Sequence, residues 1–356
     1  MSQLTRIFIV AFAFFMLPGP LCGQSGVLLG LFERLPNQST GKTVLPRLRS
    51  LWIAPRATGL SPIELPALAV PRSDGWWLLG ITRKCSDYCD SGWSEAEELW
   101  AKKGMQKAAL TQAERHCQAL FRKGPRKEEW RLSGETTQDI TFVSPDWISL
   151  TTREDEHEPC ELRGGRSSTF KKVYPFDQRD QQVDFESLLG PSSEQNYSAA
   201  LEAVRSDPKL VEQQCAILPQ EDVPAEGDWS IARGHGSWIA LAYEDVNYDC
   251  SFEAEIKQPV PQKITGPDKL LLPWPVLVQN IPKIVDAISS PSADLVVAVL
   301  PTELQVYSVS GAHLDKKLGT VEIGKNENIV MIQWATGRNV ARWTADLTTV
   351  RAALAK

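Results

Sequence analysis

The stretch DITFVSPDWISLTT at residues 139–152 contains two short runs rich in aromatic and β-branched residues, 139–143 and 147–152. Such runs favour β-strands, and the Ser144, Pro145 and Asp146 between them favour a turn, so the stretch predicts two neighbouring strands. Five further segments share this composition: residues 76–82, 169–174, 238–243, 251–257 and 295–300. Because strands follow one another in hairpin-like succession, we expect an α+β fold with mainly antiparallel sheet.

Helices are expected to be few. The candidates are residues 94–103, 199–205, 281–288 and a terminal helix at 347–354. In the first of them, Ser94 followed three residues later by Glu97 resembles a capping box.

Changes in composition suggest the domain boundaries. Residues 24–71 are rich in Leu, Pro and Arg without clear periodicity, which predicts an extended leader before an α+β domain at 72–290. At residues 291–356 we expect a small all-β sheet resembling one propeller blade, together with the terminal helix. Its candidate strands are residues 294–300, 303–309, 318–323, 329–334 and 339–343. No fixed period repeats along the chain, so the sequence does not predict a whole propeller.

The first residues resemble a secretory signal peptide. Arg6 precedes an unbroken apolar run at 7–17, and Pro18, Gly19 and Pro20 then interrupt any helix before the small Gly23. The run is too short to span a bilayer, and no later segment is a membrane candidate. We therefore expect cleavage near residue 23 and a secreted or periplasmic protein without a transmembrane segment in its mature chain. A lipid anchor at Cys22 is the alternative, disfavoured because Leu21 occupies a position where such processing prefers a small residue.

Removal of the signal peptide leaves an even set of six cysteines: Cys85, Cys89, Cys117, Cys160, Cys215 and Cys250. In an exported chain such a set predicts disulfides, although the sequence does not choose among the pairings. A metal site is the competing interpretation, because Cys85 and Cys89 stand four residues apart. No second close pair of Cys or His follows them as a zinc site would require, so we expect disulfides and no metal.

Net charge limits the class of partner. The chain has 38 Lys and Arg against 44 Asp and Glu, a formal charge of −6, and loss of Arg6 makes the mature chain one unit more negative. A nucleic-acid partner would require a positive face, so this class is excluded. Attraction to a basic protein stays open.

Motifs for nucleotide or calcium binding are incomplete. PNQSTGKT at residues 36–43 has a proline in place of the first glycine of a phosphate loop, which removes a backbone donor. Asp245, Asn247 and Asp249 alternate as in a calcium loop, but Cys250 replaces its glycine and Ile256 its bidentate carboxylate. We expect no cofactor, and a polar loop between two strands at 245–249.

The chain has four histidines, and each is a candidate catalytic or metal-binding group. His157 lies in the acidic run REDEHE at 153–158, which is more typical of a solvated loop than of a metal site. His116 adjoins Cys117, and a disulfide at that cysteine would abolish a Cys–His nucleophile. His235 lies between two glycines and His313 follows Gly311 in an expected hairpin, so both are interpreted as turn residues. With no Gly-x-Ser-x-Gly elbow, the catalytic residues stay unknown.

The order of elements at residues 139–280 resembles the extracytoplasmic module shared by lysozyme-sensing anti-sigma factors and some peptidoglycan deacetylases. The segments that carry the resemblance are an early strand pair ITFVSPDWISL (140–150), a strand turning into a short helix around Phe176, Asp177 and VDFESLLG (183–190), the helix at 199–205, the aromatic-rich GSWIALAY (236–243) with Val246 and Tyr248, and a closing strand KLLLPW (269–274).

One element of that family departs from its pattern here. The family usually carries Gly-Gly-Ala-His, whereas this chain reads Gly164-Gly165-Arg166-Ser167, so a role for that element does not transfer. The resemblance implies a binding or sensing unit. The chemistry of the deacetylases belongs to a separate domain that is not found in this chain.

Two classes of function follow. The first is a secreted or periplasmic non-enzymatic binding protein of the cell envelope, recognising a cell-wall component or a cationic wall-lytic protein such as lysozyme. The second is an envelope glycan hydrolase whose two acidic residues are brought together only by the fold, because such pairs leave no local signature. The twelve tryptophans are expected mainly in the core, while an exposed subset could bind a sugar or a protein partner.

Overall fold

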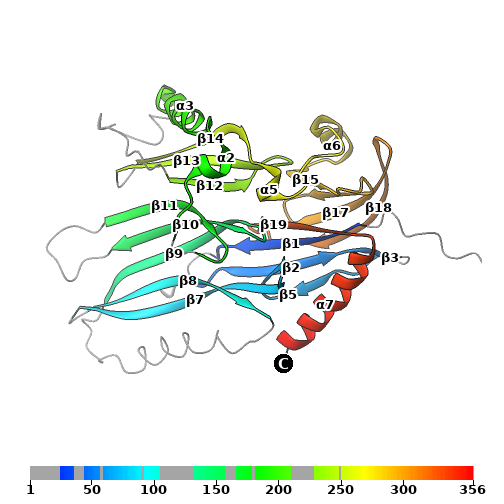
Figure 1. Cartoon of the computed structure of the whole chain (residues 1–356), viewed down its shortest axis with the longest axis horizontal. Coiled ribbons are helices and arrows are strands. Elements are labelled where there is room, and N and C mark those ends of the chain that lie inside the picture. Colours follow the sequence, from blue (N-terminus) through cyan, green and yellow to red (C-terminus); the bar gives the residue numbers. More distant parts are fainter. Residues whose placement is uncertain are drawn as a thin grey trace, which may run out of the picture.

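A computed structural model of the chain describes residues 25–35, 44–56, 59–89, 92–104, 131–156, 166–178, 181–209, 228–247 and 250–355. These residues form a mainly antiparallel β protein with few helices, as predicted, although strands dominate more than an α+β description suggests. Four main sheets of four, six, three and four strands are arranged in a propeller-like manner (Figure 1). Because these sheets differ in size, a propeller-like arrangement is compatible with a sequence that has no fixed period.

The first sheet contains the first and the last strand of the described chain. Strand β1 (Ser25–Glu33) lies between β19 (Asn328–Thr336) and β2 (Arg47–Ile53), and the short β5 (Ile63–Leu65) follows β2. The expected leader at 24–71 is therefore wrong for its described residues, which form core strands. Strand β1 is buried on both faces, so it shows a nearly continuous apolar run and not the alternation by which strands are usually recognised. A small ribbon of β3 (Pro55–Arg56) and β4 (Gly59–Leu60) adjoins this sheet.

The second sheet has the order β11-β10-β9-β8-β7-β6. Its strands are β6 (Leu68–Arg72), β7 (Gly75–Cys89), β8 (Gly92–Lys103), β9 (Arg131–Val143), β10 (Trp147–Glu156) and β11 (Arg166–Pro175). Strands β9 and β10 form the hairpin predicted from residues 139–152. All neighbours are antiparallel except β8 and β9, which run parallel.

The helix expected at 94–103 is wrong, because these residues belong to strand β8. Glu95, Glu97 and Leu99 are buried while the residues between them are more accessible, which is the two-residue period of a strand. Pairing with β7 over a long register outweighs the helical propensity of the Glu- and Ala-rich segment. The pattern that resembled a capping box therefore has no capping role.

The third sheet contains β12 (Asp228–Arg233), β13 (Trp238–Asn247) and β14 (Cys250–Pro259). Helices α2 (Phe185–Leu189) and α3 (Ser193–Arg205) lie over it, and α3 includes the predicted helix at 199–205 (Figure 1). The short α5 (Gln262–Thr265) follows β14. Residues 269–274, expected as a closing strand from the family resemblance, form no strand, and the last of them begins helix α6 (Trp274–Asn280).

The fourth sheet has the order β15 (Asp286–Ser289), β16 (Leu295–Val299), β17 (Glu303–Ser310) and β18 (His313–Glu322). Helix α6 (Trp274–Asn280) precedes it. The helix expected at 281–288 is wrong, because Lys283 has a positive φ of 66°, which lies outside the helical region, and residues from Asp286 onward form strand β15. The chain enters β15 immediately afterwards.

The C-terminal segment does not form a separate sheet. After β18, strand β19 leaves the fourth sheet and pairs with β1, so the boundary expected at residue 291 divides a sheet that begins at Asp286. Helix α7 (Arg338–Leu354) contains the predicted terminal helix, but it also contains residues 339–343, which were expected to form a strand. Gly337, with φ 57°, turns the chain into the helix, and Val340, Leu347 and Val350 form its buried stripe.

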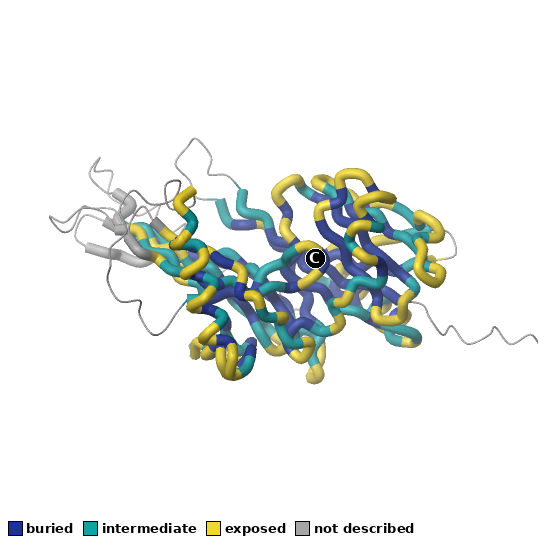
Figure 2. The backbone as a smooth tube through the Cα atoms, turned by 90° about the horizontal axis from the view of Figure 1, so that it is seen from above, coloured by how far each residue is buried: buried dark blue, intermediate teal, exposed yellow. Residues whose placement is uncertain are grey.

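The core lies on both sides of the first sheet. One cluster joins β1 and β2 to the third and fourth sheets and includes Leu29, Trp229 and Val297, whereas another joins the first sheet to the second sheet and α7 and includes Trp52 and Leu79. Buried residues run through the middle of the molecule, with exposed ones at turns and outer helices (Figure 2). The central position of the first sheet brings side chains of all four sheets to one place.

Candidate functional site

A cavity of about 620 Å³ lies where the four main sheets meet. The first sheet contributes Phe32 and residues 328–330, the second contributes 139–141, Thr151 and Lys171, the third contributes Ala232 and Arg233, and the fourth contributes Asp286 and Val299. Arg34, Gly234, His235, Val285 and Glu327 complete the lining. Since its wall combines charged, hydroxyl and apolar side chains, the cavity has the composition of a ligand pocket.

One wall is a row of side chains across the second sheet. Thr151 of β10 lies opposite Asp139 of β9 on one side and opposite Lys171 of β11 on the other. Directly opposed residues in antiparallel strands place their side chains on the same face. The row therefore presents a carboxylate, a hydroxyl and an amine in sequence across the sheet.

Asp139 is held by Arg34, which follows β1. Arg34 Nε donates to Asp139 Oδ1 over 2.8 Å, and its Nη1 and Nη2 donate to the two carboxylate oxygens of Glu97 over 2.7 and 2.9 Å. The Glu97 side chain is only 3 % exposed, so it depends on this bidentate pair and on the backbone N–H of Gln138. Arg34 thus joins β8 and β9 at the edge of the cavity.

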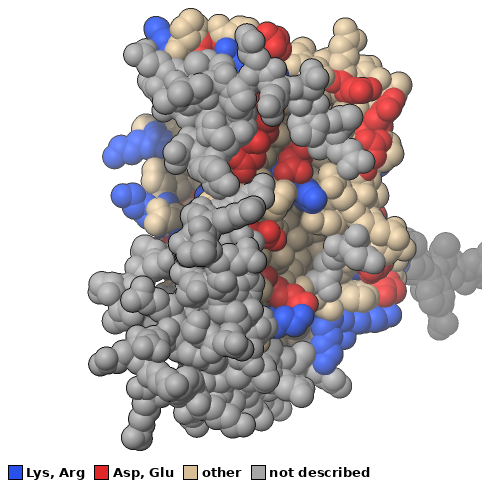
Figure 3. All heavy atoms as spheres, turned by 90° about the vertical axis from the view of Figure 1, so that its left-hand side faces the viewer, with Lys and Arg blue, Asp and Glu red and all other residues tan. Residues whose placement is uncertain are grey.

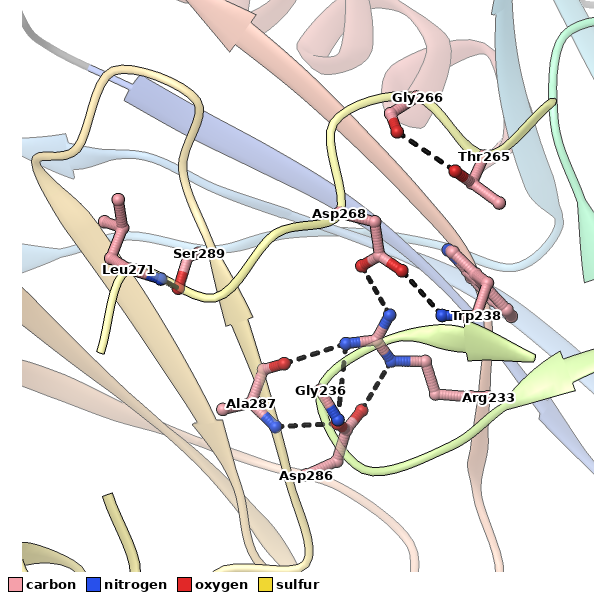
Figure 4. A network of polar contacts seen from close by, with 10 residues as sticks. All are labelled: Arg233, Gly236, Trp238, Thr265, Gly266, Asp268, Leu271, Asp286, Ala287 and Ser289. Carbon is pink, nitrogen blue, oxygen red and sulfur yellow. Dashed lines mark hydrogen bonds and ion pairs between the residues drawn. The ribbon is translucent and has the colours of Figure 1, made fainter. Parts of the chain in front are cut away.

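Arg233 forms a second network, between the third and fourth sheets (Figure 4). Its Nε donates to Asp286 Oδ2 over 2.7 Å and its Nη1 to Asp268 Oδ1 over 2.6 Å, while Nη2 donates to the carbonyl oxygen of Ala287. The two carboxylates also accept the backbone N–H groups of Gly236 and Trp238. The side chains of Arg233, Asp268 and Asp286 are all nearly buried. Because a buried charge without a partner is strongly destabilising, this packing requires both ion pairs.

Burial also affects protonation in this network. It raises the pKa of the Asp268 carboxyl above its ordinary value, although the charge and hydrogen bond of Arg233 act in the opposite direction. Asp268 lies against Arg233 and the Trp238 backbone, so its role is to fix the loop before α6.

Glu327, beside β19, is matched by Arg49 of β2. Arg49 Nε donates to Glu327 Oε1 over 2.6 Å and Nη2 reaches Oε2 at 2.5 Å, while Gly324 N–H also donates to Oε2. Burial alone would raise the pKa of Glu327, but the hydrogen bonds from Arg49 and Gly324 and the charge of Arg49 outweigh it and lower the pKa. Glu327 therefore remains ionised.

Lys171 has a shifted protonation equilibrium. Burial, followed by the positive charge of Arg153, lowers the pKa of its ammonium group to about 8, while Asp139 acts in the opposite direction. Its Nζ forms an ion pair with Glu253 and lies 4.9 Å from the ring centre of Tyr243. Lys171 thus connects the second sheet to the third across one end of the cavity.

Some polar groups of the cavity are not used by the protein. Within the described residues, neither the Thr151 hydroxyl nor the Asn328 amide forms a side-chain hydrogen bond, and Asn328 is exposed. His235 is also exposed; its Nδ1 lies 3.0 Å from the carbonyl oxygen of Val285, and its ring centre lies 5.4 Å from that of Trp274. These groups offer hydrogen bonds and an aromatic surface to a ligand, whereas Asp139, Asp286 and Glu327 are each paired with an arginine.

The predicted disulfide cysteines are only partly within the described structure. Cys85 is buried in β7. Cys89 ends β7 and Cys250 begins β14, while Cys117, Cys160 and Cys215 lie outside the described residues. The pairing therefore stays a prediction.

The predicted turn histidines are partly described. His313 is exposed and lies opposite Ser310 in the expected hairpin, and His235 lies in the turn between β12 and β13. His116, His157 and the phosphate-loop-like residues 36–43 fall outside the described residues. Residues 153–156 of the acidic run belong to β10, and Asp245 accepts the backbone N–H of Thr169. Across the described ranges, no group of three or more Cys, His, Asp or Glu is arranged for metal binding.

The residues that build the cavity were missed by sequence reasoning. Arg34, Arg49 and Arg233 have no motif around them, and their partners are far away in the chain, as with the separation of 278 residues between Arg49 and Glu327. One sequence signal was usable. Glu95 and Glu97 of β8 are two residues apart, as side chains on one face of a strand are, and buried glutamates at such positions require a basic partner.

Tryptophans contribute to the core, as predicted, with Trp52, Trp229 and Trp238 nearly inaccessible. On the face shown in Figure 3, acidic and basic side chains are intermixed, and neither sign forms a continuous field over the residues drawn in colour. In the part of the chain that the structure describes, no helix has the length and apolar character to cross a bilayer. The chain matches no family model and no curated protein.

Proposed function

We propose that this chain is an exported binding protein without catalytic activity, which recognises a cell-wall component. The observation that carries the proposal is the state of the carboxylates in the cavity. Asp139, Asp286 and Glu327 are each engaged by an arginine, while Thr151 and Asn328 keep free hydrogen-bonding capacity. Such a wall can hold a polar ligand, while the three carboxylates that line it within the described residues are already engaged.

The geometry favours binding over glycan hydrolysis. A hydrolase of the usual kind needs two carboxyl groups about 5 to 10 Å apart across the scissile bond, one of them protonated in the resting enzyme. An arginine beside a carboxylate favours its ionised form, which is the opposite of what a general acid requires. The arginine pairs of the cavity therefore oppose the hydrolase alternative.

The sequence supports the cellular setting of the proposal. The signal-peptide pattern at residues 1–23 and the six remaining cysteines are typical of an exported chain. The order of elements at 139–280 resembles a module that senses lysozyme or accompanies peptidoglycan deacetylases, which suggests either a cell-wall ligand or lysozyme itself. We favour the cell-wall ligand because a cavity of about 620 Å³ suits a small polar group better than the surface of a folded protein.

The first test is a pull-down with the oxidised mature chain, using soluble cell-wall fragments and lysozyme as separate ligands at low and high salt. The proposal predicts retention of the fragments with weak salt dependence, because uncharged hydrogen bonds are little affected by screening. Retention of lysozyme alone, weakened by salt, would favour a sensor or inhibitor of a cationic protein. Binding of neither would contradict the proposal.

A pair of variants assigns binding to the cavity. Thr151→Val removes the hydroxyl that faces the cavity and keeps the shape of the side chain. Thr152→Val is the matched control, because the next residue of a strand points to the opposite face of the sheet. We expect about three- to tenfold weaker fragment binding for Thr151→Val, consistent with one lost hydrogen bond, and no change for Thr152→Val.

A further inference from the structure

A second pocket, of about 420 Å³, lies between the β6–β7 turn, strand β19 and helix α7. Three tryptophans line it, Trp76, Trp334 and Trp343, all of them half-buried. Trp76 and Trp343 pack edge to face with ring centres 5.2 Å apart. Aromatic residues that are only partly covered and gathered in one hollow provide apolar ring surface for a ligand.

Polar side chains surround this tryptophan pocket. Asp346 of α7 accepts the indole N–H of Trp76 over 3.1 Å, which fixes its carboxylate at the edge of the aromatic wall. The other polar residues of the lining are Arg72, Ser73, Gln333 and Arg342. The pocket thus combines indole rings with charged and amide groups, which are the side chains that bind sugar hydroxyls and carboxylates.

Several of these groups lack a partner within the described residues. The exposed Arg342 makes no ion pair there, and Gln333 makes no side-chain hydrogen bond. Arg72 donates through Nη2 to Asp177 and stacks on Phe176 with its Cζ 4.4 Å from the ring centre, yet its Nη1 has no acceptor. The indole N–H of Trp334 also lacks one. Because the Arg72 Nη1 and Trp334 Nε1 atoms are themselves buried from solvent, the groups within the described residues that are free to meet a ligand here are the Arg342 guanidinium and the Gln333 amide.

We propose that the tryptophan pocket binds a saccharide that carries a carboxylate. Its ring would lie against the indoles of Trp76 and Trp343, its carboxylate would pair with Arg342, and Asp346 and Gln333 would bind its hydroxyl groups. A neutral sugar would leave the arginine unused, and a peptide without a ring would leave the aromatic wall uncovered. The proposal deepens the proposed function by naming a ligand class at a site separate from the central cavity.

The pocket gives the test a matched pair of variants on one helix. Arg342→Gln removes the guanidinium group from the pocket, and being exposed it leaves the core intact. Arg351→Gln removes the same group from the same helix. Nine residues of an α-helix make about two and a half turns, so Arg351 lies on the face of the helix opposite to Arg342. Both substitutions change the net charge equally.

The experiment is calorimetric titration of the full mature chain with a tetrasaccharide of alternating glucuronate and N-acetylglucosamine, and with its methyl ester. We expect measurable binding of the acid, about tenfold weaker binding of the ester, and a loss of about tenfold for Arg342→Gln, as for one charge-assisted bond. Arg351→Gln should bind as the unmodified chain does.

Equal binding of acid and ester, or equal effects of the two arginine substitutions, would overturn the carboxylate assignment. Absence of binding to the tetrasaccharide would overturn the saccharide assignment. Neither result would bear on the binding proposed for the central cavity, because Thr151→Val tests that site independently. Conversely, the effect of Thr151→Val on cell-wall binding says nothing about the tryptophan pocket, which is tested by the tetrasaccharide titration.

Discussion

Each carboxylate that faces the central cavity is paired with an arginine from another element. Arg34 follows β1 and reaches β8 and β9, Arg49 of β2 reaches the residue before β19, and Arg233 of β12 reaches β15. These pairs connect sheets in addition to setting the charge of the cavity. A buried charge that loses its partner is strongly destabilising, so the pairs are also points where the fold is sensitive to substitution.

Glu327→Gln tests the structural role of one pair. The Arg49 side chain is 8 % exposed and that of Glu327 1 % exposed, so the variant removes the buried counter-charge and leaves Arg49 with only the half-exposed Glu64 as an ionic partner. We expect the free energy of unfolding to fall by about 3–5 kcal/mol, measured by urea denaturation. Glu322→Gln is the control, because this exposed glutamate uses only its backbone oxygen toward Arg49. An equal effect of both substitutions would contradict the assigned role of the pair.

The same glutamate predicts a pH dependence. Its pKa in the folded chain lies below the usual value of 4.5, so the pair contributes its full stability above that pH and loses it as the pH falls through the folded-state pKa. The difference in unfolding free energy between the unmodified chain and Glu327→Gln should shrink as the pH is lowered from 6 toward ~3. A difference that stays constant over this range would show that the carboxylate charge does not matter.

At the scale of elements, amino-acid composition predicted several strands that are half-buried, but it missed strands such as β1 that are buried on both faces. The runs at 139–143, 147–152 and 238–243 lie in β9, β10 and β13 because aromatic and β-branched residues fit a half-buried sheet surface. Strand β1 was missed since both of its faces are covered and its apolar run has no period. In β8, tertiary pairing overrode a helical propensity that the local sequence does carry.

Close packing against β1 gives a prediction at this scale. A Cβ atom at Gly26 would come within 2.5 Å of Trp52 Cη2 and 2.7 Å of its Cζ2. Trp52 is buried and its indole N–H donates to Thr344 of α7, so the ring cannot easily move away. We expect Gly26→Ala to lower the unfolding free energy by about 1–3 kcal/mol in urea denaturation, as over-packing does.

Gly134→Ala in β9 is the control for this substitution. The nearest atom to a Cβ atom there is 3.6 Å away, an ordinary van der Waals distance. The control should change stability little or increase it slightly through the unfolded state. If both alanine variants were equally stable, the packing of Trp52 against β1 would be wrong.

For the whole molecule, pairing of β1 with β19 places the first and the last strand of the described chain in one sheet. No local pattern predicts this contact, because its two strands are separated by almost the whole sequence. The same separation explains why the cavity could not be predicted: its lining comes from four sheets, whose meeting is a property of the complete fold. Sequence patterns predicted many of the strands, but not which side chains come together.

Export predicts that the six cysteines remaining after signal-peptide removal are oxidised. Thiol titration of the mature chain, unfolded without a reductant, should detect no free thiol. Reduction should lower the unfolding free energy by about 2–5 kcal/mol for each bridge lost. Six reactive thiols in the chain isolated from an oxidising compartment would contradict both the disulfides and their contribution to stability.

We propose that the central cavity binds a cell-wall component without transforming it. The most direct test incubates the oxidised mature chain with soluble cell-wall fragments, separates the bound fraction and weighs the fragments by mass spectrometry. Binding without catalysis predicts that the fragments are retained by the chain, are retained less by Thr151→Val, and are recovered with unchanged mass. Cleaved or deacetylated fragments, formed faster than in a sample without the protein, would contradict it.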